Sequence, residues 1–224
     1  MGEQIRLKAS DGFELGAYLA RPEGLGKGAI VVVQEIFGVN AHIREMCDRF
    51  AAAGYAACAP ALFDRVEPGF ESGYSPEDIA RARQVMTKGD MATYIIDVAA
   101  ARDALTGFSP VSITGFCLGG SVAFGAAARL DGFLCSIPFY GGRIAAMKDE
   151  RPRCPVMMYF GTEDHSIPMS DVEVIRAAQP EAVIHVVEAQ HGFMCDHRAS
   201  YSPEVAARAW EETIGFLDRM TGNA

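Results

Sequence analysis

Short apolar segments alternate along the chain with longer segments whose apolar residues recur every three or four positions. Residues 29–33 form an unbroken apolar run, which is typical of a strand buried on both faces of a parallel sheet. An Asp11-Gly12 turn between two further apolar segments indicates a hairpin. The remaining strands are predicted at residues 5–8, 14–20, 55–60, 111–115, 133–138, 156–160 and 182–187.

Helix signals separate these strands. Asn40 is a suitable N-cap for a helix over residues 41–53. At residues 75–78, a serine cap, a proline and two acids begin a helical pattern that continues to about residue 105, with a break expected near Gly89. Other helices are expected at residues 118–130, 171–178 and 203–220.

The alternation of strands and helices indicates an α/β fold with a mostly parallel sheet that helices cover on both faces. No internal repeat, low-complexity tract or Gly/Ser linker interrupts the 224 residues, so a single domain over residues 1–224 is predicted. Half of the residues are apolar and 22% are charged, which excludes an intrinsically disordered chain. The net charge of −9, without a basic cluster, argues against nucleic acid or an anionic membrane surface as a partner.

The N-terminal segment and the cysteines are consistent with this predicted α/β domain. The N-terminal segment has no apolar stretch of signal-peptide length, so we expect a cytoplasmic protein. The six cysteines are irregularly spaced and include no C-x-x-C, so we expect reduced thiols that mostly serve as small buried side chains. No H-x-x-x-H or H-E-x-x-H pattern is present, and no metal site is expected.

The candidate nucleophile is Cys117, in the segment Gly115-Phe-Cys-Leu-Gly-Gly120 between a predicted strand and a predicted helix. Glycines two residues before and after the central residue give this segment the form of a nucleophile elbow. The N-terminus of the helix would stabilise an anion at Cys117 and thereby favour the reactive thiolate. A packed core cysteine beside a glycine-rich turn is the alternative interpretation.

A cysteine nucleophile needs a base and a group that orients the base. Asp164 and His191 each follow a predicted strand, so both should lie at the carboxyl edge of the sheet. Glu163 is an alternative to Asp164 as the orienting acid. The other histidines have simpler explanations: His165 as a surface loop residue, His185 as a strand residue, and His42 and His197 as solvated side chains.

In these features the sequence resembles the dienelactone hydrolase family of α/β-hydrolases. The resemblance covers nearly the whole chain and rests on Gln34-Glu35-Ile-Phe-Gly38, the Gly115–Gly120 segment, Asp164 and His191-Gly-Phe193. It implies a three-layer α/β-hydrolase fold with helices on both faces of a mostly parallel sheet. It also implies that Cys117 is the nucleophile, that His191 is the base and that Asp164 orients the base.

The resemblance gives roles to three further residues. Glu35 corresponds to the family's additional carboxylate, which contacts the resting thiol and helps to manage its proton; a solvated loop acid is the alternative interpretation. The backbone N–H groups of Ile36 and Leu118 would form an oxyanion hole. No metal or cofactor is required, and a monomer is expected because one chain supplies every catalytic group.

The chain departs from the family pattern at one of the two arginines that hold a substrate carboxylate. Position 195, four residues after the histidine, is a cysteine, and Arg198 is a candidate substitute. Arg81 and Arg83 are candidates for the other arginine, with a solvated helix position as the alternative. The prediction is therefore a hydrolase for a small-molecule ester or lactone. The alternatives are a carboxylesterase or thioesterase for neutral acyl substrates, and a redox-sensing thiol protein in which Cys195 would be the resolving cysteine.

Overall fold

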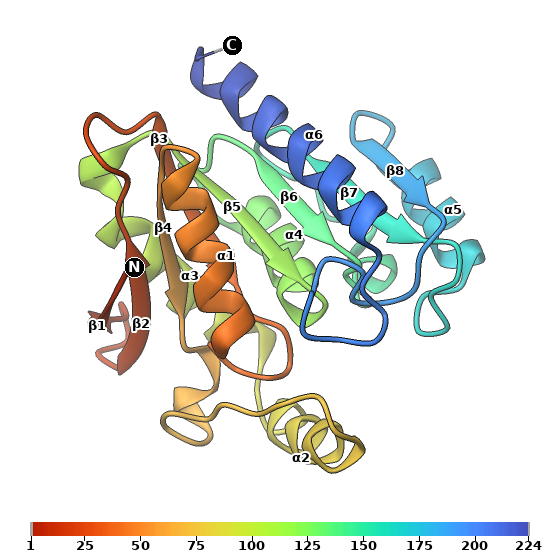
Figure 1. The fold of residues 1–224 in the computed structure, drawn as a ribbon, viewed down its shortest axis with the longest axis horizontal. Coiled ribbons are helices and arrows are strands. Elements are labelled where there is room, and N and C mark those ends of the chain that lie inside the picture. The colour runs from red at the N-terminus through yellow and green to blue at the C-terminus, as the bar shows by residue number, and fades with distance from the viewer. Residues whose placement is uncertain (1, 224) are drawn as a thin grey trace. The chain divides into compact units, whose positions relative to one another are not determined.

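A computed structural model describes residues 2–223, and in it the chain divides into two compact units. The first unit ends at Ser112 and the second begins at Ile113. Both units consist of strands and helices in alternation (Figure 1), as the apolar pattern predicts. A single domain over residues 1–224 stays a prediction. Within residues 2–223, no helix combines the length and the apolar character needed to cross a membrane.

The first unit contains strands in the order β1-β2-β4-β3. Their bounds are Glu3–Lys8 for β1, Glu14–Ala20 for β2, Gly28–Val33 for β3 and Tyr55–Pro60 for β4. Strands β1 and β2 form the predicted antiparallel hairpin, β2 pairs antiparallel with β4, and β3 pairs parallel with β4. Every residue of β3 and β4 is buried, which confirms the interpretation of the apolar run at residues 29–33.

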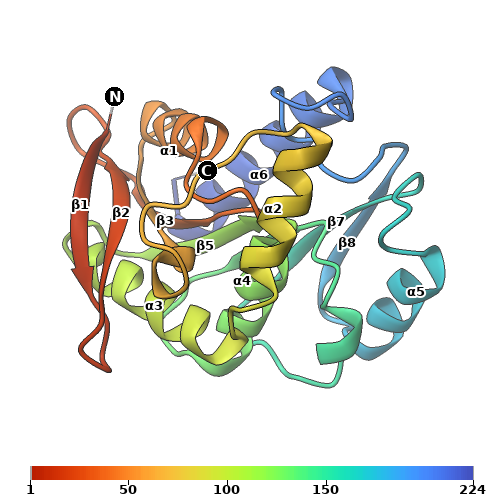
Figure 2. The same ribbon diagram turned by 90° about the horizontal axis from the view of Figure 1, so that it is seen from below.

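Helices cover both faces of this part of the sheet. Their bounds are Ala41–Ala52 for α1, Pro76–Met86 for α2 and Met91–Ala104 for α3, with short 3-10 turns at Leu62–Arg65 and Thr106–Phe108. Helices α1 and α3 pack against β3 and β4 from opposite sides (Figure 2). The predicted break near Gly89 is confirmed, since α2 ends at Met86 and α3 begins at Met91. A side chain is excluded at residue 89, because a Cβ there would lie 1.6 Å from the Tyr94 hydroxyl oxygen.

Strands β6, β7 and β8 and all but the first two residues of β5 belong to the second unit, and these four strands pair in parallel in the order β5-β6-β7-β8. Their bounds are Val111–Phe116 for β5, Ser136–Phe139 for β6, Met157–Gly161 for β7 and Val183–Val187 for β8. The helices are α4 at Leu118–Arg129, α5 at Met169–Ala178 and α6 at Pro203–Thr221, with a 3-10 turn at Ala145–Met147. In both ribbon views α4 and α6 lie on opposite faces of the strands (Figures 1 and 2). Strand β6 begins three residues later than predicted, at Ser136, where its pairing with Ile113 of β5 starts.

The parallel arrangement determines where side chains can gather. Since β5, β6, β7 and β8 all run in the same direction, the residues that follow them lie along one edge of the sheet. Those residues are Cys117, Tyr140, Asp164 and His191. The carboxyl edge of the second unit is therefore the place to look for a site.

Candidate active site

Cys117 lies at a sharp turn between β5 and α4. Its backbone has φ 57° and ψ −114°, a conformation that side-chain-bearing residues rarely adopt. The neighbouring glycines make the turn sterically feasible. A Cβ at Gly115 would lie 2.1 Å from the carbonyl oxygen of Gly119, and one at Gly120 would lie 2.3 Å from that of Phe139. The segment thus has the predicted strand–turn–helix form, with Cys117 partly exposed at the N-terminus of α4.

Asp164 and His191 form a hydrogen-bonded pair. The Asp164 side chain is fully buried, and its Oδ2 lies 2.7 Å from His191 Nδ1. Its other oxygen, Oδ1, accepts a hydrogen bond of 2.8 Å from the Ser166 backbone N–H. Because a carboxylate can only accept, the proton of the imidazole lies on Nδ1 and Nε2 is left as the basic nitrogen. The adjacent Glu163 is exposed, so the structure favours Asp164 as the orienting acid.

The Cys117 thiol lies near the imidazole of His191, because it is among the groups that shift the pKa of this histidine. Burial lowers the pKa of His191, but the charge of a Cys117 thiolate and the hydrogen bond that His191 donates to Asp164 raise that pKa by more, to about 10. With the thiolate formed, His191 is therefore protonated at neutral pH. A thiolate–imidazolium pair is a potent nucleophile with a proton donor beside it.

Tyr140 packs against His191 and was not identified from the sequence. Its ring centroid lies 5.0 Å from that of His191 and 5.2 Å from that of Phe193, and the side chain is fully buried. The backbone of Tyr140 has φ 38°, and its N–H donates a 2.8 Å hydrogen bond to the carbonyl of Tyr159 on β7. An aromatic residue before Gly141-Gly142, at the end of the strand after the elbow, is the pattern that could have indicated it.

Two more of the predicted residues lie in the second unit. Leu118 is the first residue of α4, where backbone N–H groups have no acceptor within the helix. Arg198 packs against the residue next to His191, because a Cβ on Gly192 would lie 2.3 Å from Arg198 Nη1. Cys195, which occupies the position of the family's arginine, is completely buried.

The other predicted residues belong to the first unit. Glu35 is only 1% exposed, so its interpretation as a solvated loop acid is wrong. The loop that carries Glu35 and Ile36 is held by the Gln34 side chain, which donates to the Glu35 carbonyl at 3.2 Å and accepts from the Leu62 N–H at 3.0 Å. Arg81 and Arg83 are exposed on α2, and Arg81 forms an ion pair with Glu67. This exposure fits the alternative in which both arginines are solvated helix residues.

Comparison with known proteins identifies the family. Residues 15–221 match the model of the dienelactone hydrolase family. This chain belongs to the dienelactone hydrolase family. It is accordingly a hydrolase, and the resemblance drawn from its sequence motifs is confirmed.

Individual relatives support the same assignment to the dienelactone hydrolase family. A Synechocystis sp. protein assigned as a carboxymethylenebutenolidase is 36% identical over 220 residues, which cover 89% of each chain. The carboxymethylenebutenolidase of Pseudomonas putida is 31% identical, with 96% of this chain and 95% of that protein covered. A solved structure from Klebsiella pneumoniae, assigned as a dienelactone hydrolase, has a TM-score of 0.81 at 32% identity and covers 97% of this chain and 98% of that one. The predicted α/β-hydrolase fold is thus confirmed.

Histidines and cysteines outside the site of this family member mostly lie as predicted. His165 and His197 are exposed, and His185 on β8 stacks its ring on Tyr159 at 4.6 Å. His42 is 1% exposed, so its prediction as a solvated side chain is wrong; it lies among the buried residues of α1. Four cysteines are buried as predicted, namely Cys47, Cys58, Cys135 and Cys195.

Proposed function

We propose that this hydrolase cleaves a small ester or lactone with Cys117 as nucleophile, His191 as base and Asp164 as the group that orients His191. The observation that carries the proposal is the hydrogen bond between His191 Nδ1 and the buried Asp164 carboxylate, at 2.7 Å, with Cys117 at the same edge of the sheet and close enough to act on the pKa of His191. The strained elbow conformation of Cys117 supports it, since such conformations cluster at sites of chemistry.

In the first half of the reaction the Cys117 thiolate attacks the carbonyl carbon and forms a C–S bond. The carbonyl oxygen takes up the electron pair and is stabilised by the N–H of Leu118 and, in our proposal, the N–H of Ile36. When the intermediate collapses, the C–O bond to the alcohol breaks and the leaving oxygen takes the proton of the His191 imidazolium. A thioester remains on Cys117.

In the second half, neutral His191 takes a proton from water, which attacks the thioester carbonyl. The C–S bond breaks, the carboxylic acid is released, and the thiolate and imidazolium are restored. Asp164 stabilises the imidazolium in both halves without itself taking the proton. Cys117, Asp164 and His191 all belong to the second unit of one chain, which supports a monomeric enzyme. We also propose that the enzyme is cytoplasmic.

Turnover of p-nitrophenyl acetate tests the nucleophile and the base. Cys117→Ala should abolish turnover and acetylation of the protein, with Cys154→Ala as the matched cysteine control. His191→Ala should lower turnover by at least ~10²-fold, the usual contribution of a general base, whereas His185→Ala should not. A Cys117→Ala protein that retains turnover would refute the nucleophile and leave the redox-sensing alternative. Loss of turnover in His185→Ala instead would refute the base.

We propose that Glu35 shifts the proton equilibrium of Cys117 between turnovers, away from the thiolate–imidazolium pair and toward the thiol. Its burial supports a role inside the protein, and a carboxylate close to a thiol would disfavour early formation of the thiolate by like charge. The test is the rate of Cys117 alkylation by iodoacetamide as a function of pH. Glu35→Gln should shift the profile to lower pH, whereas identical profiles for the two proteins would rule this role out.

The substrate is proposed to be neutral rather than anionic, unlike the carboxylate-bearing butenolide in the name of the relatives. The arginine four residues after the histidine is absent here, and loss of one hydrogen bond to a charged group costs about 1.5–3 kcal/mol, or ten- to a hundredfold in affinity. The measurement is kcat/KM for a neutral lactone against its carboxylate-bearing analogue. A tenfold preference for the anion would overturn this proposal, and Arg198→Ala, Arg81→Ala and Arg83→Ala would then locate the anchoring arginine.

A further inference from the structure

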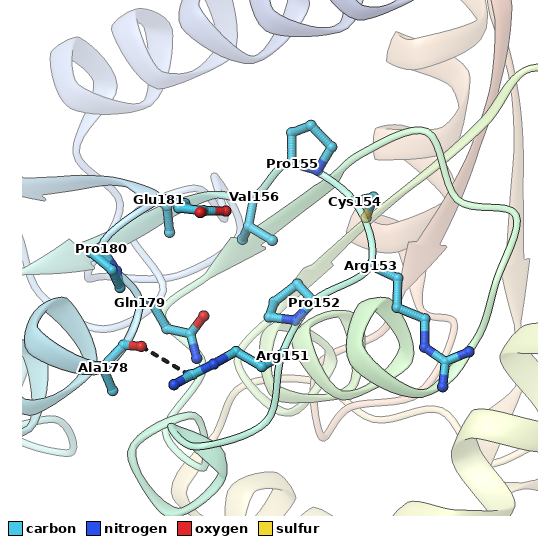
Figure 3. Close-up of a pocket in the computed structure, with 11 residues that line it drawn as sticks. Arg151, Pro152, Arg153, Cys154, Pro155, Val156, Ala178, Gln179, Pro180 and Glu181 are labelled. Atoms are coloured by element: carbon cyan, nitrogen blue, oxygen red, sulfur yellow. Dashed lines mark hydrogen bonds between the residues drawn. The ribbon is translucent and has the colours of Figure 1, made fainter.

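A cavity lies at the opposite edge of the sheet from Cys117. It has a volume of about 520 Å³, within the range of small-molecule sites. Its walls are residues 151–156, which precede β7, and residues 178–182, between α5 and β8 (Figure 3). Asp164 and His191 follow the other ends of these same two strands. A five-residue strand is roughly 16 Å long, so a molecule in this cavity would not reach the catalytic groups.

Hydrogen bonds hold the walls of this cavity in place. Gln179 is 6% exposed, and its Nε2 donates to the carbonyls of Lys148 at 2.5 Å and Glu150 at 2.7 Å. Arg151 Nη1 donates to the carbonyl of Ala178 at 3.0 Å, as Figure 3 shows. Three prolines add rigid apolar surface, namely Pro152, Pro155 and Pro180. The cavity is therefore largely formed before any ligand binds, which lowers the entropic cost of binding.

The polar groups in the cavity are only partly satisfied. Both N–H groups of the Gln179 amide are used, so the amide is fixed, and within residues 2–223 its Oε1 receives no hydrogen bond. The Arg151 guanidinium has one hydrogen bond, to Ala178, and retains further N–H donors. Glu181 has no ion-pair partner in the described part of the chain. One cavity thus presents an arginine and a glutamate that do not pair with each other.

These groups define the complementary ligand. The spare donors of Arg151 suit a carboxylate. Gln179 Oε1 and Glu181 suit an ammonium group. The proline rings and Val156 offer an apolar surface. From this arrangement we infer that the cavity binds a zwitterionic amino acid with an apolar side chain.

Calorimetric titration of the full chain with L-leucine tests this inference, and two probes isolate the charges. The first is 4-methylpentanoate, which is leucine without its ammonium group, and the second is 3-methylbutylamine, which is leucine without its carboxylate. Leucine should bind saturably, and each probe should bind at least about tenfold more weakly, because each lacks one charged contact. Equal binding of 4-methylpentanoate and leucine would overturn the inference in favour of a simple anion site.

The variants Arg151→Gln and Glu181→Gln should each weaken leucine binding by about ten- to a hundredfold. Arg153→Gln is the matched control. Arg153 belongs to the same wall, but its guanidinium points away from the other lining side chains (Figure 3) and is engaged by the Ala128 carbonyl and by Asp131. All three variants should retain esterase turnover, which confirms that they fold. An absence of binding by the unmodified protein up to about 10 mM leucine, or equal loss in all three variants, would refute the site.

Discussion

Substitution of Gly120 by alanine should displace the nucleophile without touching any catalytic side chain. Gly120 lies in the first turn of α4, three residues after Cys117. The added methyl group would lie 2.3 Å from the carbonyl oxygen of Phe139, the last residue of β6, and 3.1 Å from the backbone nitrogen of Gly141. That same Phe139 carbonyl accepts a 3.1 Å hydrogen bond from the N–H of Cys117. Backbone surrounds the methyl group, so no flexible side chain can make room for it.

The required movement follows from these distances. An ordinary contact of about 3.4 Å demands that α4 and β6 separate by about 1 Å at this point. Overpacking of this kind costs about 1–3 kcal/mol of folding free energy. The same shift strains the hydrogen bond that fixes Cys117, and misplacement of a reacting group by 1 Å can lower the rate about 10²-fold. A 10²-fold loss is about 2.7 kcal/mol of activation free energy, similar to the folding cost, but a domain stable by about 5–15 kcal/mol should stay folded while it loses nearly all of its turnover.

The assay combines urea denaturation with turnover of p-nitrophenyl acetate. Gly142→Ala is the control, because its new methyl group would approach only the Ile167 Cγ1, at an ordinary 3.8 Å. We expect Gly120→Ala to be folded in buffer, with kcat/KM reduced about 10²-fold and acetylation of Cys117 slowed to match. Unchanged turnover in Gly120→Ala, or an equal loss in both variants, would refute the steric argument.

Three further predictions concern the thiols and the base. Iodoacetamide near neutral pH should label Cys117 well before Cys154, because burial raises the pKa of Cys154 to about 12; preferential labelling of Cys154 in a peptide map would contradict this. In the folded protein the pKa of His191 is about 10, above its ordinary value of 6.5. Protonation of His191 therefore contributes its full stabilisation of the fold below about pH 6.5. That contribution is lost as the pH rises toward 10. The stability advantage over His191→Gln should shrink across that range, and a constant difference in urea titrations would argue against it. Tyr140→Ala should lower kcat up to about tenfold with little change in KM, because aromatic contacts contribute about 0.5–1.5 kcal/mol; an effect on KM alone would assign Tyr140 to substrate binding.

Much of the fold could be predicted because local signals and long-range packing agree. The serine, proline and acids at residues 75–78 begin α2 as predicted, and Ser75 with Asp78 forms a reciprocal capping box. The unbroken apolar run at residues 29–33 lies within β3, which is buried throughout. At residues 133–135 the apolar pattern continues, but pairing with β5 begins only at Ser136, and no local pattern specifies where a neighbouring strand is met.

The sequence predicts that Cys117, Asp164 and His191 follow strands at one edge of the sheet, and the structure has them there because a motif and a strand end coincide at each. Their catalytic roles stay a proposal. Tyr140 has only a weak signal, an aromatic residue before two glycines at a strand end, and its packing on His191 is what distinguishes it. The prediction of His42 as a solvated side chain is wrong because it, too, depends on the local pattern alone. A histidine at the start of a helix is usually solvated, and its burial at 1% exposure depends on tertiary packing that a helical pattern does not record.

The backbone of Cys117 places chemical activity and folding stability in conflict. A residue other than glycine held at φ 57° and ψ −114° costs about 1–3 kcal/mol, and in this chain the residue that carries the cost is the proposed nucleophile. Cys117→Gly should relieve the strain that Cys117→Ala retains, and it should raise the free energy of unfolding relative to Cys117→Ala by up to about 2 kcal/mol after the added flexibility of glycine is subtracted. The most stable residue at the centre of the elbow is then one that cannot react. Variants selected only for thermal stability should lose the thiol here, so any effort to stabilise this enzyme must select for turnover at the same time.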